Sequence, residues 1–286
     1  MSHHSRRLLI LAAVLATTNS MAFGSATAEI RTDGLVISSF NNGSGDHISE
    51  TNVAPDDKVS PRIIGGSPAS TNTYPWVVIV GKGCGGALIA PTKVLTAGHC
   101  ADKATTIIVG RDKNHGSGGR QFTVTARSKA PHFQTISESP DLHFDDVAVL
   151  TLDKAVSGVT PVNFAGPDDG GLYQPGNTGT VFGWGAHSDG HLAKATVPVV
   201  SDSCFDMGGP YKNDKQSPAA MKRSLFCAGD TMHDACSGDS GGPLLINGKL
   251  AGIVSGGGTN GDCAQKGKPG TYSRVSNYSK WIGQHL

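Results

Sequence analysis

From residue 61 to its end, the chain alternates between short apolar runs and turn-forming residues, and this pattern restricts the fold more than any other feature. The runs are rich in Val, Ile and Thr and are bounded by Gly, Pro, Asn or Asp, which is typical of β-strands joined by turns. Glycine supports the same interpretation, since 39 of the 286 residues are glycine against a usual share of roughly 7%. Many short strands at fairly regular spacing predict an all-β sandwich or barrel. The predicted strands are 76–80, 86–90, 93–97, 105–109, 121–126, 147–152, 179–184, 196–200, 243–246, 249–255 and 270–275.

The last segment is the only good candidate for a helix. In VSNYSKWIGQHL, the residues Val275, Tyr278, Trp281 and Ile282 recur at helical spacing and fall on one face. The sequence therefore predicts a C-terminal helix after the β-structure.

The first 28 residues predict a secretory signal peptide. Two arginines precede an apolar run over residues 8–16, and Ala26 and Ala28 form an A-x-A pattern before Glu29. The run is too short for a transmembrane helix, which needs about 20 apolar residues. Residues 29–60 are polar with little apolar periodicity and are interpreted as a mobile segment, not a domain. We expect a secreted, extracellular mature protein that does not associate with membranes.

Six cysteines in an exported chain indicate three disulfides but leave their pairing open. The sequence contains no C-x-x-C motif and no Cys/His spacing that is typical of a zinc site. We therefore expect no metal and no other cofactor. The net charge of +1 gives no reason to expect nucleic acid as a partner. The cysteines are Cys84, Cys100, Cys204, Cys227, Cys236 and Cys263.

The stretch DACSGDSGGP, residues 234–243, surrounds Ser240 with three glycines. A serine hydroxyl is a poor nucleophile at neutral pH and needs a base, usually histidine, with an acid to orient that base. Glycines let backbone N–H groups approach a developing oxyanion without a Cβ in the way. Candidates for the base and the acid are His99 in VLTAGHC and Asp146 in FDDVAVLTL. Each alone is more often structural, and the stretch itself could be a glycine-rich turn with an incidental serine; the order His, Asp, Ser instead indicates nucleophilic catalysis.

These segments together resemble the trypsin-like serine proteases of the chymotrypsin family. The motifs RIIGG, TAGHC, DVAVL, GDSGGP and KPGTYSRV occur in the family's order and at compatible spacing between Arg62 and Leu286. GDSGGP with TAGHC is a highly specific pair. The resemblance implies two six-stranded antiparallel Greek-key β-barrels with a C-terminal helix, and a catalytic site in the cleft between the barrels.

By the same resemblance, Ser240 attacks the scissile carbonyl, His99 accepts its proton and later protonates the leaving amine, and Asp146 orients His99. The backbone N–H groups of Gly238 and Ser240 form the oxyanion hole. Asp145 also precedes the strand, but the family pattern selects Asp146.

The resemblance further implies activation by cleavage between Arg62 and Ile63. The new amine of Ile63 would form a buried ion pair with Asp239, which makes a good candidate for a switch. The implied organisation is a signal peptide over residues 1–28, an activation propeptide over 29–62 and a peptidase domain over 63–286. The alternative for RIIGG is a first strand after a linker.

Asp234 lies six residues before Ser240, at the position that forms the floor of the family's primary specificity pocket. An acid there would pair with substrate Arg or Lys, and Gly257 and Gly270 would leave room for the long side chain. Ser255, beside the pocket in GIVSGG, matches the serine that supports the buried aspartate. The alternative for Asp234 is a solvated loop aspartate.

The family pattern suggests the disulfide pairs Cys84–Cys100, Cys204–Cys227 and Cys236–Cys263. Two features of the sequence depart from animal trypsins.

The first is Gly256, where those proteins usually have a tryptophan that lines the binding cleft. The second is a loop in which trypsins often bind calcium through acidic side chains; its corresponding ends here are Arg111 and Arg120. We therefore expect no calcium site in this loop.

The sequence thus predicts a secreted serine endopeptidase, made as a zymogen, that cleaves after Arg or Lys. Expected partners are protein or peptide substrates containing Arg or Lys and protein protease inhibitors, and the expected state is a monomer. The main rival is a catalytically silent protease homologue that acts as a binding protein. Such a protein typically lacks one residue of the triad, and none is missing here.

Overall fold

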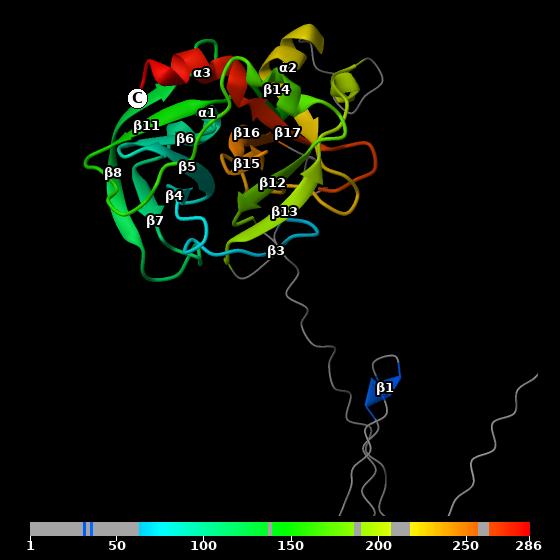
Figure 1. The fold of residues 1–286 in the computed structure, drawn as a ribbon, viewed down its shortest axis with the longest axis horizontal. Coiled ribbons are helices and arrows are strands. Elements are labelled where there is room, and N and C mark those ends of the chain that lie inside the picture. The colour runs from blue at the N-terminus through cyan, green and yellow to red at the C-terminus, as the bar shows by residue number, and fades with distance from the viewer. Residues whose placement is uncertain are drawn as a thin grey trace, which may run out of the picture. The chain divides into compact units, whose positions relative to one another are not determined.

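The computed structural model describes residues 31–32, 35–36, 63–136, 139–185, 190–206, 218–256 and 263–286 (Figure 1). The first two pieces form a hairpin in which β1 (Arg31–Thr32) pairs antiparallel with β2 (Leu35–Val36). This hairpin belongs to a separate unit of the chain and is described by itself. It lies in the segment 29–60, for which the sequence predicts no domain.

Six strands form a closed antiparallel barrel in the order β11-β6-β5-β4-β7-β8 (Figure 1). Branched side chains suit the pleated surface of a strand, and Val78, Val94, Ile107 and Leu150 fill one buried core cluster of this barrel. Leu95, next in sequence to Val94, belongs to a different buried cluster. Successive residues of these strands are thus buried on opposite faces. The strands are β4 (Val77–Val80), β5 (Cys84–Ala90), β6 (Lys93–Thr96), β7 (Thr106–Val109), β8 (Arg120–Lys129) and β11 (Ala148–Leu152).

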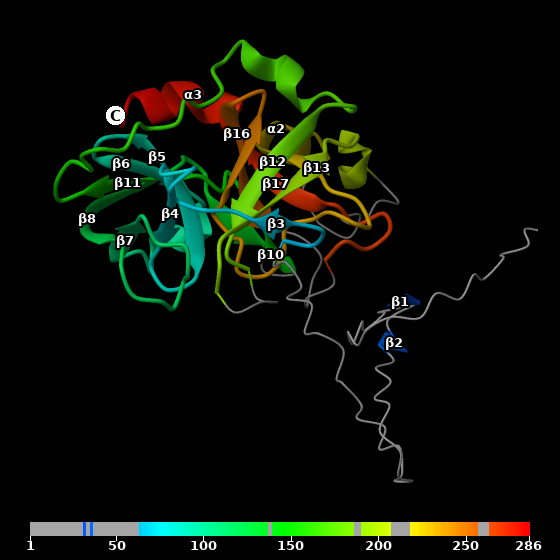
Figure 2. The same ribbon diagram turned by 60° about the horizontal axis from the view of Figure 1, so that its bottom comes forward.

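Seven strands form a second antiparallel sheet in the order β14-β17-β16-β15-β12-β13-β3 (Figure 1). Figure 2 shows β3, β12, β13, β16 and β17 of this sheet from another side. An isolated bridge from Val199, just after β13, to Ala228 in β14 joins the two ends of the six longer strands. Phe226, Leu244 and Tyr272 lie in the core of this half. The strands are β3 (Ser67–Pro68), β12 (Thr178–Gly183), β13 (Ala193–Pro198), β14 (Leu225–Ala228), β15 (Pro243–Ile246), β16 (Lys249–Gly256) and β17 (Gly270–Arg274).

The predicted fold class is confirmed, with one closed six-stranded barrel, a second sheet and a C-terminal helix. Each predicted strand overlaps a strand of the structure. The sequence analysis missed β3, β14 and the hairpin of β9 (Gln134–Ile136) with β10 (Ser139–Phe144). Strands β3 and β9 are very short, and β14 follows a helix without an intervening turn residue. None of these three strands therefore shows a clear alternation of period two in the sequence.

Helix α3 (Val275–Gly283) is the predicted C-terminal helix. It follows β17 of the second sheet and lies over the first barrel in Figure 1. Val275 and Ile282 pack in one cluster with Leu95 and Val149 of that barrel. Tyr278 and Trp281 are partly buried against the same cluster. The end of the chain therefore joins the two halves.

The expectation of a single good helix was wrong, because the structure also contains α1 (Gly98–Ala101) and α2 (Pro218–Ser224). Both are too short to show a helical period in the sequence. Two 3₁₀ segments, η1 (Asp169–Tyr173) and η2 (Asp202–Phe205), are also short. Within the described residues, no helix has the length and apolar character needed to cross a membrane.

Candidate active site

His99 and Asp146 meet at one end of the first barrel. Thr96 at the end of β6 pairs with Ala148 at the start of β11, so the residues just after β6 and just before β11 lie together. His99 Nδ1 is 2.8 Å from Asp146 Oδ2, and the His99 backbone N–H donates to Asp146 Oδ1 at 2.8 Å. Two contacts thus fix the imidazole relative to the carboxylate.

The second sheet completes the surroundings of Asp146. Ser255 Oγ in β16 donates to Asp146 Oδ2 at 2.7 Å, and Ser273 Oγ in β17 donates to the Asp146 carbonyl oxygen at 2.8 Å. Asp146 is completely buried, and burial by itself raises the pKa of a carboxyl group. The hydrogen bond from His99, the electrostatic interactions with His99 and His143 and the hydrogen bond from Ser255 together outweigh burial and lower the pKa of Asp146. The side chain therefore remains an anion beneath the imidazole.

Ser240 lies on a turn that is clamped between the two halves. Its carbonyl oxygen accepts from the Gly85 N–H in β5 at 2.8 Å, and the next residue, Gly241, donates to the Val254 carbonyl oxygen in β16 at 2.8 Å. Gly241 has φ +74°, and a Cβ there would collide with the Thr96 hydroxyl and the Gly85 carbonyl oxygen. Glycine is required at this close approach, which places Ser240 against the barrel edge that carries His99.

Gly238 and Asp239 give the turn its remaining shape. Gly238 has φ +92°, which side chains rarely permit, and it is exposed. Asp239 is fully buried, and its carboxylate accepts from the backbone N–H groups of Gly185 at 2.8 Å and Cys236 at 2.9 Å. A Cβ on Gly183 or Gly185 would collide with this carboxylate. Gly183 at the end of β12 and Gly185 just after it thus make room for the acid.

Asp234 is buried on the same long turn. Its Oδ2 accepts from the Ala264 N–H at 3.0 Å and its Oδ1 accepts from the Gly270 N–H at 3.2 Å. Burial, only partly offset by these bonds, raises the pKa of Asp234 to about 7. A Cβ on Gly270 would lie 2.6 Å from Asp234 Oδ1, so the carboxylate can occupy this position only because residue 270 has no side chain.

The first residues of the predicted mature chain contact the same turn. Ile63 is fully buried, and Ile64 forms an antiparallel bridge with Asp234, with the Ile64 N–H donating to the Asp234 carbonyl oxygen at 3.0 Å. A Cβ on Gly65 would collide with the Met232 carbonyl oxygen. The segment that starts at Ile63 is therefore built into the wall of this site.

Comparison with known proteins agrees with this geometry. The sequence profile of one family, Trypsin, matches residues 63–282. The chain belongs to the trypsin family. It is 38% identical to a trypsin of Saccharopolyspora erythraea over 76% of this chain and 94% of that protein. It is 32% identical both to cationic trypsin-3 of Rattus norvegicus, over 80% and 92% of the two chains, and to human kallikrein-7, over 82% and 90%.

The structure contains the same three disulfides that resemblance to the trypsin family implies. Cys84–Cys100 joins β5 to α1 beside His99, and Cys236–Cys263 joins the Ser240 turn to the segment that carries Ala264. The third bond, Cys204–Cys227, joins η2 to β14. Two of the three therefore brace segments of the site.

Most of the predicted site residues come together in this structure, but two cannot be placed. Arg62 and Gly257 lie outside the described residues, so the activation bond and one pocket wall remain predictions. The absence of a calcium site also remains a prediction. At that loop, Arg111 Nε donates to the Gly118 carbonyl oxygen at 2.8 Å, and Arg120 Nη1 donates to Ser157 Oγ at 3.2 Å.

His143 is a site residue that the sequence analysis missed. Its ring stacks on the His99 ring with centroids 4.3 Å apart, and its Nδ1 is 3.1 Å from Thr135 Oγ1. Potential ligand atoms of His99, His143 and Asp146 lie within 4.8 Å of one another, but His99 and Asp146 already bind each other. No sequence motif marks His143, because it lies in β10 and comes next to His99 in α1 only in the folded structure.

Proposed function

We propose that this member of the trypsin family is an exported serine endopeptidase that is made as a zymogen and cleaves after Arg or Lys. The observation that carries the proposal is the pairing of a buried, anionic Asp146 with His99 at the edge against which the Ser240 turn packs. A silent homologue acting as a binding protein would have no need to keep these groups together.

In the proposed reaction, Ser240 Oγ attacks the scissile carbonyl carbon while His99 Nε2 takes the hydroxyl proton. The tetrahedral oxyanion accepts hydrogen bonds from the backbone N–H groups of Gly238 and Ser240. His99 then gives the proton to the leaving amine as the C–N bond breaks. Water hydrolyses the acyl-enzyme by the same steps, and Asp146 stabilises the imidazolium each time.

The proposed preference for Arg and Lys rests on Asp234. A completely buried carboxyl group with a pKa of about 7 has little to stabilise its charge, so an entering guanidinium or ammonium group supplies what the site lacks. Gly270, whose Cβ would crowd Asp234, is consistent with a pocket that must hold a long side chain.

The proposed activation rests on the packing of the segment after Arg62. Ile63 is buried, and Ile64 pairs with Asp234 on the turn that also holds Asp239 and Ser240. Cleavage after Arg62 would release an amine whose charge can pair with the buried Asp239. Because a basic residue precedes the bond, active enzyme could itself cleave the precursor. The signal peptide over 1–28 and secretion belong to the same proposal, as do peptide substrates and protein inhibitors as partners.

The test uses peptide anilides that differ only in the residue before the scissile bond, Arg, Lys or Phe. The protein starts at Ile63, and Ser240→Ala is the blank. We expect hydrolysis of the Arg and Lys peptides only. Hydrolysis of the Phe peptide instead would contradict the role of Asp234, and no hydrolysis by correctly folded protein would favour the silent binding homologue.

A further inference from the structure

Asp145, the residue before Asp146, has an unusual conformation for a buried acid. Its φ is +47°, in the left-handed region that few side chains adopt, and it is 7% exposed. Its carbonyl oxygen accepts from the Val147 N–H at 2.9 Å, which closes a tight turn around Asp146. The backbone on the two sides of Asp146 is therefore tied together directly beside Asp145.

Two hydroxyl groups from other elements hold Asp145 in this turn. The Asp145 N–H donates to Ser224 Oγ at 2.7 Å, and the Tyr278 hydroxyl donates to Asp145 Oδ1 at 2.6 Å. The two hydroxyl oxygens are 2.9 Å apart. Since an N–H only donates and a carboxylate only accepts, Ser224 must donate to Tyr278 for all three contacts to form. The three residues thus make a closed ring in which each donor is used once.

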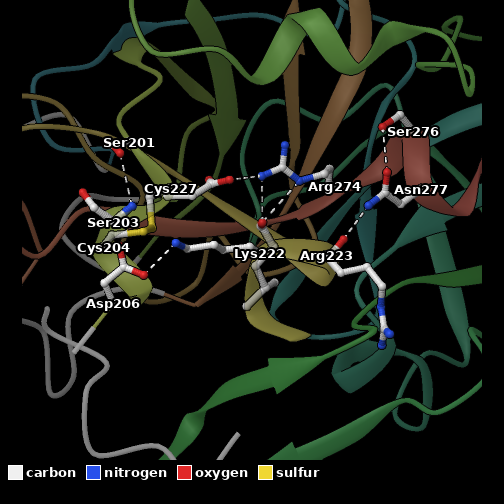
Figure 3. Close-up of polar contacts among 12 residues, drawn as sticks. Ser201, Ser203, Cys204, Asp206, Lys222, Arg223, Cys227, Arg274, Ser276 and Asn277 are labelled. Carbon is white, nitrogen blue, oxygen red and sulfur yellow. Dashed lines mark hydrogen bonds and ion pairs between the residues drawn. A yellow bond between two sulfur atoms is a disulfide. The ribbon is translucent and has the colours of Figure 1, made fainter. Parts of the chain in front are cut away.

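The two hydroxyl-bearing residues are themselves fixed in place. Ser224 ends α2 and is fully buried. The residues on either side of it are also bound. Asn277 Nδ2, in α3, donates to the Arg223 carbonyl oxygen at 2.5 Å (Figure 3). Arg274 Nη2, at the end of β17, donates to the Leu225 carbonyl oxygen at 3.1 Å. Burial, together with the hydrogen bond to Asp145, raises the pKa of Tyr278, so its hydroxyl stays protonated and able to donate.

We propose that Tyr278 and Ser224 are positioning residues, which hold the Asp145 turn so that the Asp146 carboxylate stays aligned with His99. The inference rests on the proposed peptidase function, since it assigns a task to residues behind the same site. Tyr278 binds Asp145, and the adjacent Asp146 binds the imidazole, so these two residues connect the hydroxyl to His99. Loss of the hydroxyl should therefore alter the chemical step and not substrate binding.

The test removes single hydroxyl groups with Tyr278→Phe and Ser224→Ala in the protein that starts at Ile63. We expect kcat for an Arg anilide to fall at least about tenfold, because small misalignments of catalytic groups are costly, with KM unchanged. Tyr173→Phe is the matched control. Its buried hydroxyl also makes two hydrogen bonds, to the Ala251 carbonyl oxygen and from the Ser276 N–H, but none to the Asp145 turn.

A second readout does not depend on turnover. A proton shared between imidazole and carboxylate resonates far downfield, so the His99 Nδ1 proton reports alignment with Asp146. We expect its signal to shift or broaden in Tyr278→Phe and to stay in place in Tyr173→Phe, with both variants keeping a cooperative thermal transition. Asp145→Asn, which tolerates φ > 0 and keeps the acceptor Oδ1, should retain most of kcat.

Equal kcat values and equal proton spectra for Tyr278→Phe and Tyr173→Phe would overturn the inference. Failure of the proposed function looks different, because wild-type protein would then hydrolyse no anilide at all. In that case the proton signal still decides whether Tyr278 aligns Asp146.

Discussion

The first barrel presents His99 and Asp146 from the ends of two paired strands, whereas the second sheet presents Asp234 and Ser240 from one long turn between β14 and β15. Strand register fixes the first pair, since Thr96 lies opposite Ala148. The long turn has no such ladder.

Instead, segments distant in sequence hold the long turn. Three of its glycines, Gly229, Gly238 and Gly241, have positive φ, and its acids bind the backbone of Gly185, Ala264 and Gly270. This turn should therefore be easier to disorder than the His99–Asp146 pair. In the proposed activation, cleavage after Arg62 would then control only the half of the site that holds Asp234 and Ser240.

The largest expected effect tests whether the halves act as one unit. We expect His99→Ala and Ser240→Ala each to lower kcat by about 10⁶-fold, with the double variant no worse, because neither group works without the other. Single-turnover kinetics on an Arg anilide would measure this. Additive losses would mean that the two halves contribute separately.

The second prediction separates the halves. The proposed activation pairs the Ile63 amine with Asp239. In the protein that starts at Ile63, Asp239→Asn would leave this buried amine without its anion and lower the free energy of unfolding by about 3–5 kcal/mol. We expect kcat/KM to fall about 10²- to 10³-fold while the downfield His99 proton stays in place. Movement of that proton would show that the barrel pair also depends on the activation segment.

The third prediction concerns the contact between the halves at Gly241. An alanine there must adopt φ +74° and would collide with Thr96 and Gly85, so we expect a loss of about 3 kcal/mol in the free energy of unfolding. Gly170→Ala is the control, since open space surrounds that glycine, and it should change stability by less than about 0.5 kcal/mol. Both glycine variants are made in the Ser240→Ala protein, and urea unfolding measures their free energies of unfolding. Similar losses for the two variants would argue against a tight contact at Gly241.

The smallest effect is the pH dependence of the pocket. Because the pKa of Asp234 is about 7, acid protonates it and removes the anion that a cationic ligand needs. Affinity for benzamidine should fall up to tenfold per pH unit below about 7, with proton release on binding at pH 6. Calorimetry on Ser240→Ala protein would detect both, and Asp234→Asn should abolish the dependence. A flat profile would contradict the raised pKa.

The same raised pKa has a consequence for folding. An unfolded aspartate has a pKa of about 3.9, so between that value and about 7 the folded state binds the extra proton. Ionisation of Asp234 therefore makes the fold less stable as the pH rises through this window. Entry of a substrate cation would offset that loss.

The sequence by itself determined the fold class and, through its motifs, the residues of the proposed site. Short β-branched runs bounded by turn residues can bury their apolar faces only in sheets, and the predicted strands all appear. The motifs around His99, Asp146 and Ser240 are local, so their spacing can be read directly. Strands β3 and β14 and the two short helices were missed because their few residues carry no period.

Only the tertiary structure decided which side chains meet across the chain. The family pattern in FDDVAVL selects Asp146 over Asp145, but only the structure shows that Asp145 binds Tyr278 while Asp146 binds His99. His143, Ser224, Ser273 and Tyr278 come from distant segments, and no local pattern shows that they contact the site or its supporting turn. Their roles follow from strand register and from the packing of α3 across both halves, which local spacing does not encode because long-range contacts form only when the whole core closes.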